Sequence, residues 1–434
     1  MASEIENAGP GSSLLSASTG EPIWDRPHRP AWMRALNGVG GGLRRLGLLW
    51  PRLDPELLLA AAQRRAGAGL SDWGDDGFRA GLRALVDAFE AQGNAHTFGR
   101  LFFREYCVAA LTNRLRIQDD LNRHPEILDT PIHRPLFITG LPRSGTTFLH
   151  RLMCEDPGGR PLLFWETLEP SPSPRFETRL TDPRIARARR QVALFNSLAP
   201  RVRAAHLFDA ESPEECNQLF VHGFIAGVNG FLFDVPQYVE WMRDQSLLEP
   251  YRYLRRQLQL LSWRWPGDPW LLKAPAHIYG LDSLLAVFPD ACIVQIHRDP
   301  LQVLPSLCSL AAAVRGITSD CVDLKRLGAE FTEAMARGTE RAIDARASAD
   351  PARFFDVTYS SLLADPVATV RAVRHHFGYA YDDEFAARMR RWLAENPQHK
   401  HGVHRYSLEQ FGLDAEVVNR RFARYREWTS QWGS

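Results

Sequence analysis

The stretch Pro135-Leu-Phe-Ile-Thr-Gly-Leu-Pro-Arg-Ser-Gly-Thr-Thr-Phe-Leu-His150 decides the fold. Its first part, Leu136 to Thr139, is a short apolar run with the length and branching of a buried parallel strand. The chain breaks at Gly140, and from Gly145 onward apolar residues recur at helical spacing. A strand, a glycine-bounded turn and a helix can cradle a phosphate. Backbone N–H groups in the turn point inward, and the helix N-terminus carries a partial positive charge.

The loop departs from an ordinary nucleotide-binding P-loop in one way. Gly140 and Gly145 have the P-loop spacing, but Thr146 and Thr147 stand where such a loop has lysine followed by a hydroxyl residue. In an ATP or GTP enzyme that lysine reaches the β/γ-phosphates and the hydroxyl holds magnesium. Here a different cation, Arg143, lies inside the loop. The pattern predicts a nucleotide with a single phosphate at its 5′ end. The alternative is a plain glycine turn between strand and helix.

The segment Pro142-Arg-Ser-Gly-Thr-Thr147 resembles the 5′-phosphosulfate loop of the sulfotransferases that use 3′-phosphoadenosine 5′-phosphosulfate (PAPS). The resemblance extends over roughly residues 130 to 430 and is to the broad bacterial group related to tyrosylprotein-type sulfotransferases. It implies a P-loop-like, three-layer α/β fold with a mostly parallel sheet. It also implies that the donor is bound by the loop residues Arg143, Ser144, Gly145, Thr146 and Thr147.

Composition limits the remaining possibilities. The net charge of the 434 residues is +1, so no global field attracts nucleic acid. Six dispersed cysteines indicate reduced thiols rather than a disulfide framework. The start of the chain has no apolar signal region, and no run of 18 apolar residues occurs, so we expect a cytoplasmic location and no membrane span.

Three regions are expected along the chain. Residues 1–22 have the composition of a disordered tail, residues 23–130 form a helical N-terminal region, and residues 131–434 form the PAPS-binding domain. After the loop, strand patterns alternate with helical ones, which implies a parallel sheet covered on both faces. The strand patterns span 160–166, 270–273, 291–298 and 353–359.

A second donor motif follows the pattern at 291–298. Arg298 and Ser306 resemble the 3′-phosphate motif of sulfotransferases, in which an arginine is followed some eight residues later by a serine. A forked guanidinium and a hydroxyl suit a phosphate. Asp299 and Pro300 fit the cap and first residue of a helix.

The resemblance implies further donor contacts late in the chain. Tyr359 lies in a segment similar to the one near the adenine, although the family's Glu-Asp pair is Ser-Ser here. Lys400 and Arg405 belong to a basic loop expected to close over the 3′-phosphate. The His-x-His-x-x-His spacing in that loop suggests a metal site only weakly, since no cysteine or carboxylate accompanies it.

Two residues are candidates for the general base. Glu166 ends the strand pattern 160–166 and resembles the glutamate that follows the loop in related sulfotransferases. His206 is the rival, because an imidazole has a suitable pKa. Ser212-Pro-Glu-Glu215 reads as a capping box, which makes Glu214 and Glu215 helix-start residues first and catalytic candidates second. Each candidate also has an ordinary structural explanation.

Lys273 is one of only three lysines among 52 basic residues. It resembles the lysine that contacts the bridging oxygen between sulfate and phosphate. Downstream of the capping box, a cluster of aromatic residues can be core, acceptor pocket or both. The cluster comprises Phe220, Phe224, Phe231, Phe233, Tyr238 and Trp241.

The sequence thus predicts a PAPS-dependent sulfotransferase that needs no metal and acts on a hydroxyl of an apolar small molecule. Its oligomeric state is left open. A P-loop small-molecule kinase is the main alternative, disfavoured by the missing loop lysine. A nucleotide-binding scaffold without catalysis is the other.

Overall fold

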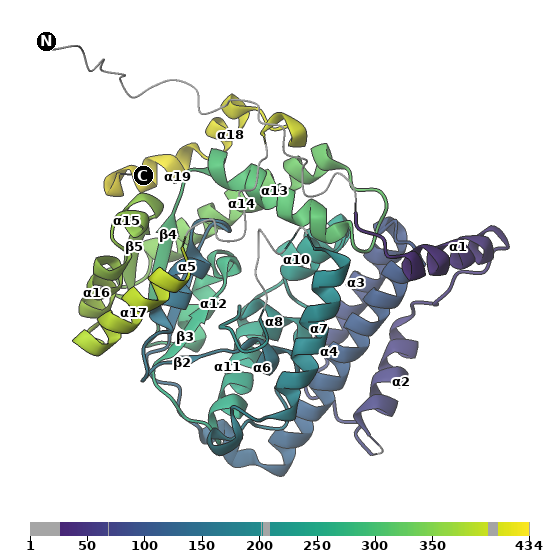
Figure 1. Cartoon of the computed structure of the whole chain (residues 1–434), viewed down its shortest axis with the longest axis horizontal. Helices are drawn as coiled ribbons and strands as arrows, with labels where there is room; N and C mark the ends of the chain where they lie inside the picture. The colour runs from purple at the N-terminus through teal and green to yellow at the C-terminus, as the bar shows by residue number, and fades with distance from the viewer. Residues whose placement is uncertain (1–26, 68, 201, 203–208, 398–406, 434) are drawn as a thin grey trace, which may run out of the picture.

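The computed structural model describes residues 27–67, 69–200, 202, 209–397 and 407–433. Its centre is a five-stranded parallel sheet with the strand order β2-β3-β1-β4-β5. The strands are β1 (Leu136–Gly140), β2 (Arg160–Pro161), β3 (Trp270–Lys273), β4 (Cys292–His297) and β5 (Phe354–Thr358). Because all five strands are parallel, their carboxyl ends lie along one edge of the sheet (Figure 1).

Helices cover both faces of this sheet. Successive side chains of a strand point to opposite faces, and because those on both faces are apolar here, both faces need a cover. Leu136 and Ile138 of β1 belong to a core shared with α5, α16 and α17, while Phe137 belongs to the core on the opposite face. The first layer consists of α5 (Thr146–Met153), α16 (Pro366–Phe377) and α17 (Asp383–Glu395). The second includes α11 (Leu248–Ser262), α12 (Leu281–Val287), α13 (Pro300–Arg315) and α14 (Leu324–Ala347). The predicted three-layer α/β fold is confirmed.

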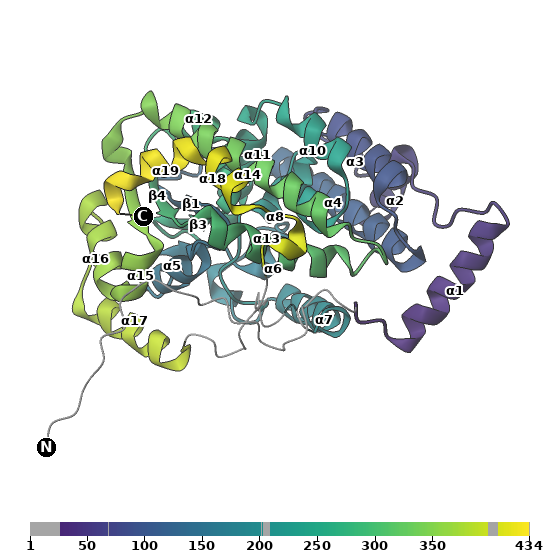
Figure 2. The same ribbon diagram turned by 90° about the horizontal axis from the view of Figure 1, so that it is seen from above.

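The helical N-terminal region is built from α1 (Ala31–Arg45), α2 (Pro55–Ala66), α3 (Phe78–Gln92) and α4 (Thr97–Arg123). Helices α2, α3 and α4 share a separate core with the segment around α9 (Val228–Leu232) and α10 (Pro236–Arg243). The buried aromatic side chains Phe224, Phe233 and Tyr238 lie in that core. Helix α1 projects from the body in both views (Figures 1 and 2).

Two predicted elements are wrong. The strand pattern 160–166 forms pairs only at Arg160–Pro161, and α6 (Phe164–Leu168) begins soon after. The predicted helix starting at Ser212 begins instead with α8 (Asn217–Phe220), and no capping box forms at Ser212. The remaining helices are α7 (Pro183–Leu198), α15 (Tyr359–Ala364), α18 (Ala415–Arg421) and α19 (Ala423–Thr429), with short 3₁₀ turns between elements. Within the described ranges, no helix combines the length and the apolar composition needed to cross a bilayer.

Candidate active site

Four of the predicted site residues lie at or just beyond strand ends. Lys273 ends β3, Arg298 follows β4 and Tyr359 follows β5, while Arg143 lies in the loop after β1. The loop has unusual backbone geometry, with φ of +67° at Arg143 and +95° at Gly145. A Cβ on Gly145 would lie 3.1 Å from the Tyr359 ring, so glycine lets the loop pass close to that ring.

The two predicted donor motifs meet at this edge. The Nε of Arg143 donates to the Oγ of Ser306 (3.1 Å), and an Nη of Arg298 donates to the Arg143 carbonyl (2.7 Å). The Arg298 guanidinium lies 3.9 Å from the centroid of the Tyr359 ring. Two guanidinium groups, a hydroxyl and an aromatic ring are therefore clustered, although the Arg143 loop lies 155 residues before Arg298 in the sequence. Asp299 caps α13 with Pro300 as its first residue, as predicted.

Ser144 gives this cradle an unsatisfied polar group. Its hydroxyl is buried and has no hydrogen-bond partner within the described part of the chain. Buried hydroxyl groups nearly always have a partner, so an orphan in a phosphate-type loop is typical of a ligand position.

A second polar cluster lies beside the loop. Lys273 is buried, with 1% of its surface exposed. Its Nζ donates to Oε1 of Glu215 (2.6 Å) and to Oγ1 of Thr147 (3.2 Å). Thr147 thus links the loop helix α5 to the lysine. Burial of an ammonium is costly unless it is paired, and Glu215 supplies the opposite charge.

A cavity of about 620 Å³ adjoins both polar clusters. Arg143, Thr147, Glu214 and Glu215 contribute to its wall. Most of the rest is apolar and includes Phe231, Leu232, Val239, Met242, Leu307, Leu310, Ile278 and Met335. A cavity with a mainly apolar wall and interspersed polar groups is the usual form of a small-molecule site.

Comparison with known proteins identifies the family. A model described as the sulfotransferase family matches residues 135–383. The chain belongs to the sulfotransferase family. It is 26% identical, over 299 residues, to omega-hydroxy-beta-dihydromenaquinone-9 sulfotransferase Stf3 of Mycobacterium bovis and of Mycobacterium tuberculosis. That match covers 67% of this chain and 74% of the relative.

Two solved sulfotransferases have the same fold. STF1 of Mycobacterium tuberculosis H37Rv matches with a TM-score of 0.77 and 34% identity, covering 86% of this chain and 100% of that one. STF9 of Mycobacterium avium matches with a TM-score of 0.80 and 30% identity, covering 87% and 97%. The chain is therefore a sulfotransferase enzyme, and its cavity is the candidate active site.

The acidic residues of this sulfotransferase cavity come from a segment that the sequence misassigned. Residues 213–215 are not helical, and Pro213 pairs with Leu163 in an isolated bridge. Glu214 N donates to the Leu162 carbonyl (2.8 Å), and Cys216 N donates to the Lys273 carbonyl (3.0 Å). These bonds compete with the local capping pattern, and they bring Glu215 to the end of β3. The capping-box pattern at Ser212 predicted a helix start here, so the sequence did not indicate this arrangement.

Glu214 has an environment that suits proton transfer. It is 8% exposed, and burial raises the pKa of its carboxyl to about 7, an effect that the Lys273 charge opposes. One carboxylate oxygen accepts a hydrogen bond from Glu215 N (2.8 Å). A carboxyl with a pKa near neutrality can hold or release a proton at physiological pH.

Glu166 lies elsewhere. It occupies the first turn of α6 rather than a strand end, it is fully buried, and it is not part of the cavity wall. Arg160 donates to both of its oxygens, and Leu163 N donates to Oε2 (3.0 Å). The Arg160 guanidinium is itself held between the rings of Trp265 and Trp270. Every oxygen of Glu166 is thus committed to a closed ion pair.

Of the remaining predicted site residues, one lies at the cavity and three fall outside the described ranges. Thr146 is buried at the start of α5, within the loop's first helical turn, and lines the cavity. His206, Lys400 and Arg405 lie outside the described residues. No group of three or more potential metal-ligating side chains occurs in the part of the chain that the structure describes.

Further charged residues line the cavity, namely Glu240, Arg243, Asp244, Arg315, Glu330, Arg337 and Arg341. Two of them, Arg315 and Glu330, form a pair that sequence reasoning missed. Arg315, the last residue of α13, donates to the Gly230 carbonyl (2.6 Å) and lies near Asp234 (3.2 Å) and Glu330 (3.4 Å). Arg315 and Glu330 both line the cavity. Only the folding of α13 against α14 brings this pair together, so no local pattern could reveal it.

Proposed function

We propose that this sulfotransferase transfers the sulfuryl group of PAPS to a hydroxyl of an apolar, lipid-like small molecule. The observation that carries the proposal is the convergence of the Arg143 loop and Arg298–Ser306 beside a cavity that is lined by Glu214 and Glu215. Lys273 lies behind this wall, bonded to Glu215. The residues fit such a donor. The Ser144 hydroxyl has no partner among the described residues, and any side chain at position 145 would crowd the Tyr359 ring, which glycine avoids. When bound, PAPS supplies the sulfuryl group.

The donor side divides into two anion sites. Loop N–H groups, the Ser144 hydroxyl and Arg143 would hold the 5′-phosphosulfate. Arg298 and Ser306 would hold the 3′-phosphate, with Tyr359 near the base. The basic loop with Lys400 and Arg405 is proposed to add cations to the second site.

We propose Glu214 as the general base. It lines the cavity, and its raised pKa suits deprotonation of an alcohol. Glu215 would then hold Lys273 in place, and Lys273 would neutralise charge that develops on the leaving phosphate. His206 stays a rival base. For Glu166 we propose a structural role in the Arg160 ion pair.

The acceptor class follows from the cavity. Its volume of about 620 Å³ and mainly apolar wall suit a hydrocarbon-rich alcohol better than a sugar or a peptide. A relative with 26% identity bears the name of a hydroxylated menaquinone sulfotransferase, which fits this class.

Two measurements test the proposal. Calorimetric titration should show binding of 3′-phosphoadenosine 5′-phosphate at least about tenfold tighter than binding of ATP with magnesium, because only the former fills both anion sites. Labelled PAPS should then transfer its label to long-chain or isoprenoid alcohols and less to polar ones. Tighter binding of ATP-magnesium would favour a kinase. Donor binding without transfer to any acceptor class would favour a scaffold.

A further inference from the structure

Helix α1 and the turn that follows it expose an unusual number of large apolar side chains. Six of the thirteen exposed large hydrophobic residues in the described ranges fall between positions 32 and 50, each 47–75% exposed. They are Trp32, Val39, Leu46, Leu48, Leu49 and Trp50. We call residues 31–52 the α1 arm. Such a concentration in one short segment marks an interaction surface.

The helix has a clear inner face and outer face. Met33, Asn37 and Gly40 face the body, and a Cβ on Gly40 would lie 1.7 Å from Oγ1 of Thr97, so this face packs closely on α4. Trp32, Val39 and Leu46 follow one another at a spacing of seven residues and form a separate row along the helix. One edge of the half-exposed Trp32 ring contacts Phe98 of α4 (ring centroids 5.5 Å apart), while Val39 and Leu46 are 67% and 75% exposed. The arm therefore has a second apolar stripe that stays largely exposed.

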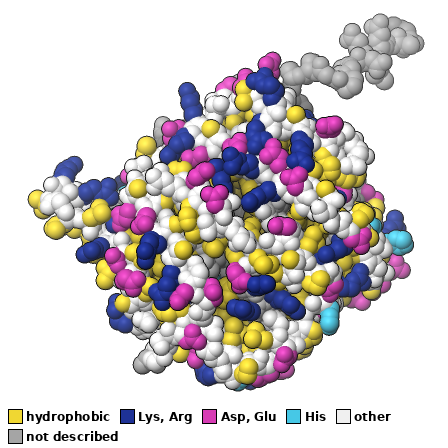
Figure 3. Space-filling view, turned by 180° about the vertical axis from the view of Figure 1, so that it is seen from behind, with side chains coloured by type: hydrophobic (Ala, Val, Ile, Leu, Met, Phe, Trp, Pro, Cys, Tyr) yellow, Lys and Arg dark blue, Asp and Glu magenta, His cyan; other side chains and the backbone are white. Residues whose placement is uncertain are grey.

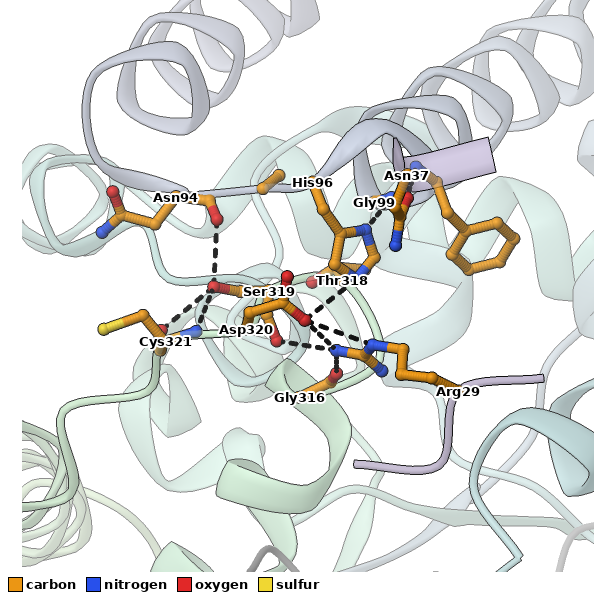
Figure 4. A network of polar contacts seen from close by, with 12 residues as sticks. Arg29, Asn37, Asn94, His96, Gly99, Gly316, Thr318, Ser319, Asp320 and Cys321 are labelled. Carbon is orange, nitrogen blue, oxygen red and sulfur yellow. Dashed lines mark hydrogen bonds and ion pairs between the residues drawn. The ribbon is translucent and has the colours of Figure 1, made fainter. Parts of the chain in front are cut away.

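Polar bonds hold the helix in this orientation. Arg29 donates to the carbonyls of Gly316 and Ser319 (2.5 and 3.0 Å) and to the Asp320 carboxylate (3.0 Å) at the end of α13 (Figure 4). The Asn37 Oδ1 accepts from Phe98 N (2.9 Å). At the other end, Arg44 donates to the Ala95 carbonyl (2.8 Å). Because both ends of the helix are anchored, the outward direction of the stripe is set by the fold.

The turn after α1 extends the stripe. Leu48 N donates to the Leu43 carbonyl (3.0 Å), and Gly47 adopts a φ of +77°, which is the usual way for a helix to end and the chain to fold back. This turn places Leu48, Leu49 and Trp50 after Leu46, so that the arm ends in an apolar tip.

The charge on this segment has one sign. Residues 27–53 contain five arginines and neither aspartate nor glutamate. Arg45 and Arg52 form no ion pair with any described residue, and they flank the apolar tip. In Figure 3 the projecting arm, at the left, carries mainly hydrophobic and basic side chains. The surface thus combines leucine and tryptophan with arginines that make no ion pair within the described ranges.

We propose that the α1 arm binds the surface of a membrane containing anionic lipids. Tryptophan and leucine would enter the boundary between headgroups and acyl chains, and Arg34, Arg45 and Arg52 would meet lipid phosphates. The charge favours this occupant over a second copy of the chain, since a symmetric pairing of two arms would bring arginines against arginines. The inference is independent of which acceptor the enzyme uses.

Vesicle flotation with the full-length protein tests the proposal. The protein should float with phosphatidylcholine vesicles containing about 30% phosphatidylglycerol, should bind pure phosphatidylcholine at least about tenfold more weakly, and should be released by high salt. The triple variant Leu46→Gln/Leu48→Gln/Leu49→Gln and the double variant Arg45→Glu/Arg52→Glu should each lower the partition coefficient on anionic vesicles about tenfold or more.

A matched control uses equally exposed apolar residues elsewhere: Leu180→Gln/Leu194→Gln/Val417→Gln should float like wild type. All variants should melt at the same temperature. The proposal is overturned if wild type ignores anionic vesicles, or if the control variant loses as much binding as the arm variant. A wild-type dimer in light scattering that Leu46→Gln/Leu48→Gln/Leu49→Gln converts to a monomer would also overturn it, with a second copy as occupant.

Discussion

The donor side and the acceptor side of the cavity differ in how the chain assembles them. On the donor side, Arg143 lies in the five-residue loop between β1 and α5, and Arg298 directly follows a strand, so each group is positioned by the element next to it in sequence. On the acceptor side, Glu214 and Glu215 are positioned by bonds to Leu162 and Lys273, residues about fifty to sixty positions away. Local patterns therefore describe the first side well and the second side poorly.

The same contrast explains the two acidic candidates. Glu166 follows a strand in sequence and looks like a strand-end carboxylate, yet α6 turns it into the protein, where Arg160 binds it. Glu214 looks like part of a helix cap, yet its backbone bond to Leu162 holds it in a non-helical segment that lines the cavity. Variants of both residues test whether this difference in position is also a difference in role.

The largest expected effect is on turnover of Glu214→Gln. If Glu214 takes the acceptor proton, glutamine keeps its shape but not its basicity, and kcat should fall about 10²–10⁴-fold with donor affinity nearly unchanged. Glu166→Gln should instead lower the free energy of unfolding, by up to about 3–5 kcal/mol, because it leaves the Arg160 guanidinium buried without its counter-charge. Its turnover per folded molecule should change less than about threefold.

Steady-state kinetics and urea unfolding of both variants separate these effects. A collapse of turnover in Glu166→Gln with normal stability would restore Glu166 as the base. A large loss in His206→Asn alone, with Glu214→Gln active, would assign the proton transfer to His206.

The dependence of kcat/KM on pH should also show whether Glu214 is the base. Burial raises the pKa of Glu214 to about 7, and a base works only when deprotonated. Hence kcat/KM should rise with pH up to about 7 and fall about tenfold per unit below it. An acidic limb near the ordinary carboxylate value of about 4.3 would contradict this expectation. The limb should vanish from the residual activity of Glu214→Gln.

The sequence predicted the donor side because strand, turn and helix signals there agree with the tertiary structure. The loop after β1, the cap at Asp299 and the proximity of Arg298 to Arg143 all depend on strand ends meeting at one edge of a parallel sheet. The Ser212 cap failed because backbone bonds to Leu162 and Lys273 outweigh a local cap worth about 1 kcal/mol. Arg315 and Glu330 were missed because their meeting depends on how two helices pack. The predicted roles of His206, Lys400 and Arg405 remain predictions, because these residues lie outside the described ranges.

A smaller effect is expected on the donor side. Arg298→Ala removes a charge-assisted contact worth about 1.5–3 kcal/mol, so affinity for 3′-phosphoadenosine 5′-phosphate should fall about ten- to hundredfold by calorimetry. Affinity for adenosine 5′-phosphosulfate, which lacks the 3′-phosphate, should change little. Arg298→Lys keeps the charge but loses the fork and the stacking on Tyr359, and it should fall between wild type and alanine. Equal losses for both nucleotides would refute the assignment of Arg298 to the 3′-phosphate.

The smallest effect discriminates between two serines on one helix. Ser306 and Ser309 are both buried on α13, but only Ser306 accepts the hydrogen bond from Arg143 at the donor edge, while the Ser309 hydroxyl has no partner within the described ranges. Ser306→Ala should therefore weaken nucleotide binding by about 0.5–1.5 kcal/mol, roughly two- to twelvefold in calorimetric Kd, because a hydroxyl contact to phosphate and the support of Arg143 are both lost. Ser309→Ala removes an unsatisfied buried hydroxyl three residues farther along α13, and nucleotide affinity should stay within about twofold of wild type, with stability equal or higher. If the two variants bind nucleotide equally well, Ser306 contributes only packing. The 3′-phosphate site would then consist of Arg298 without its proposed hydroxyl partner.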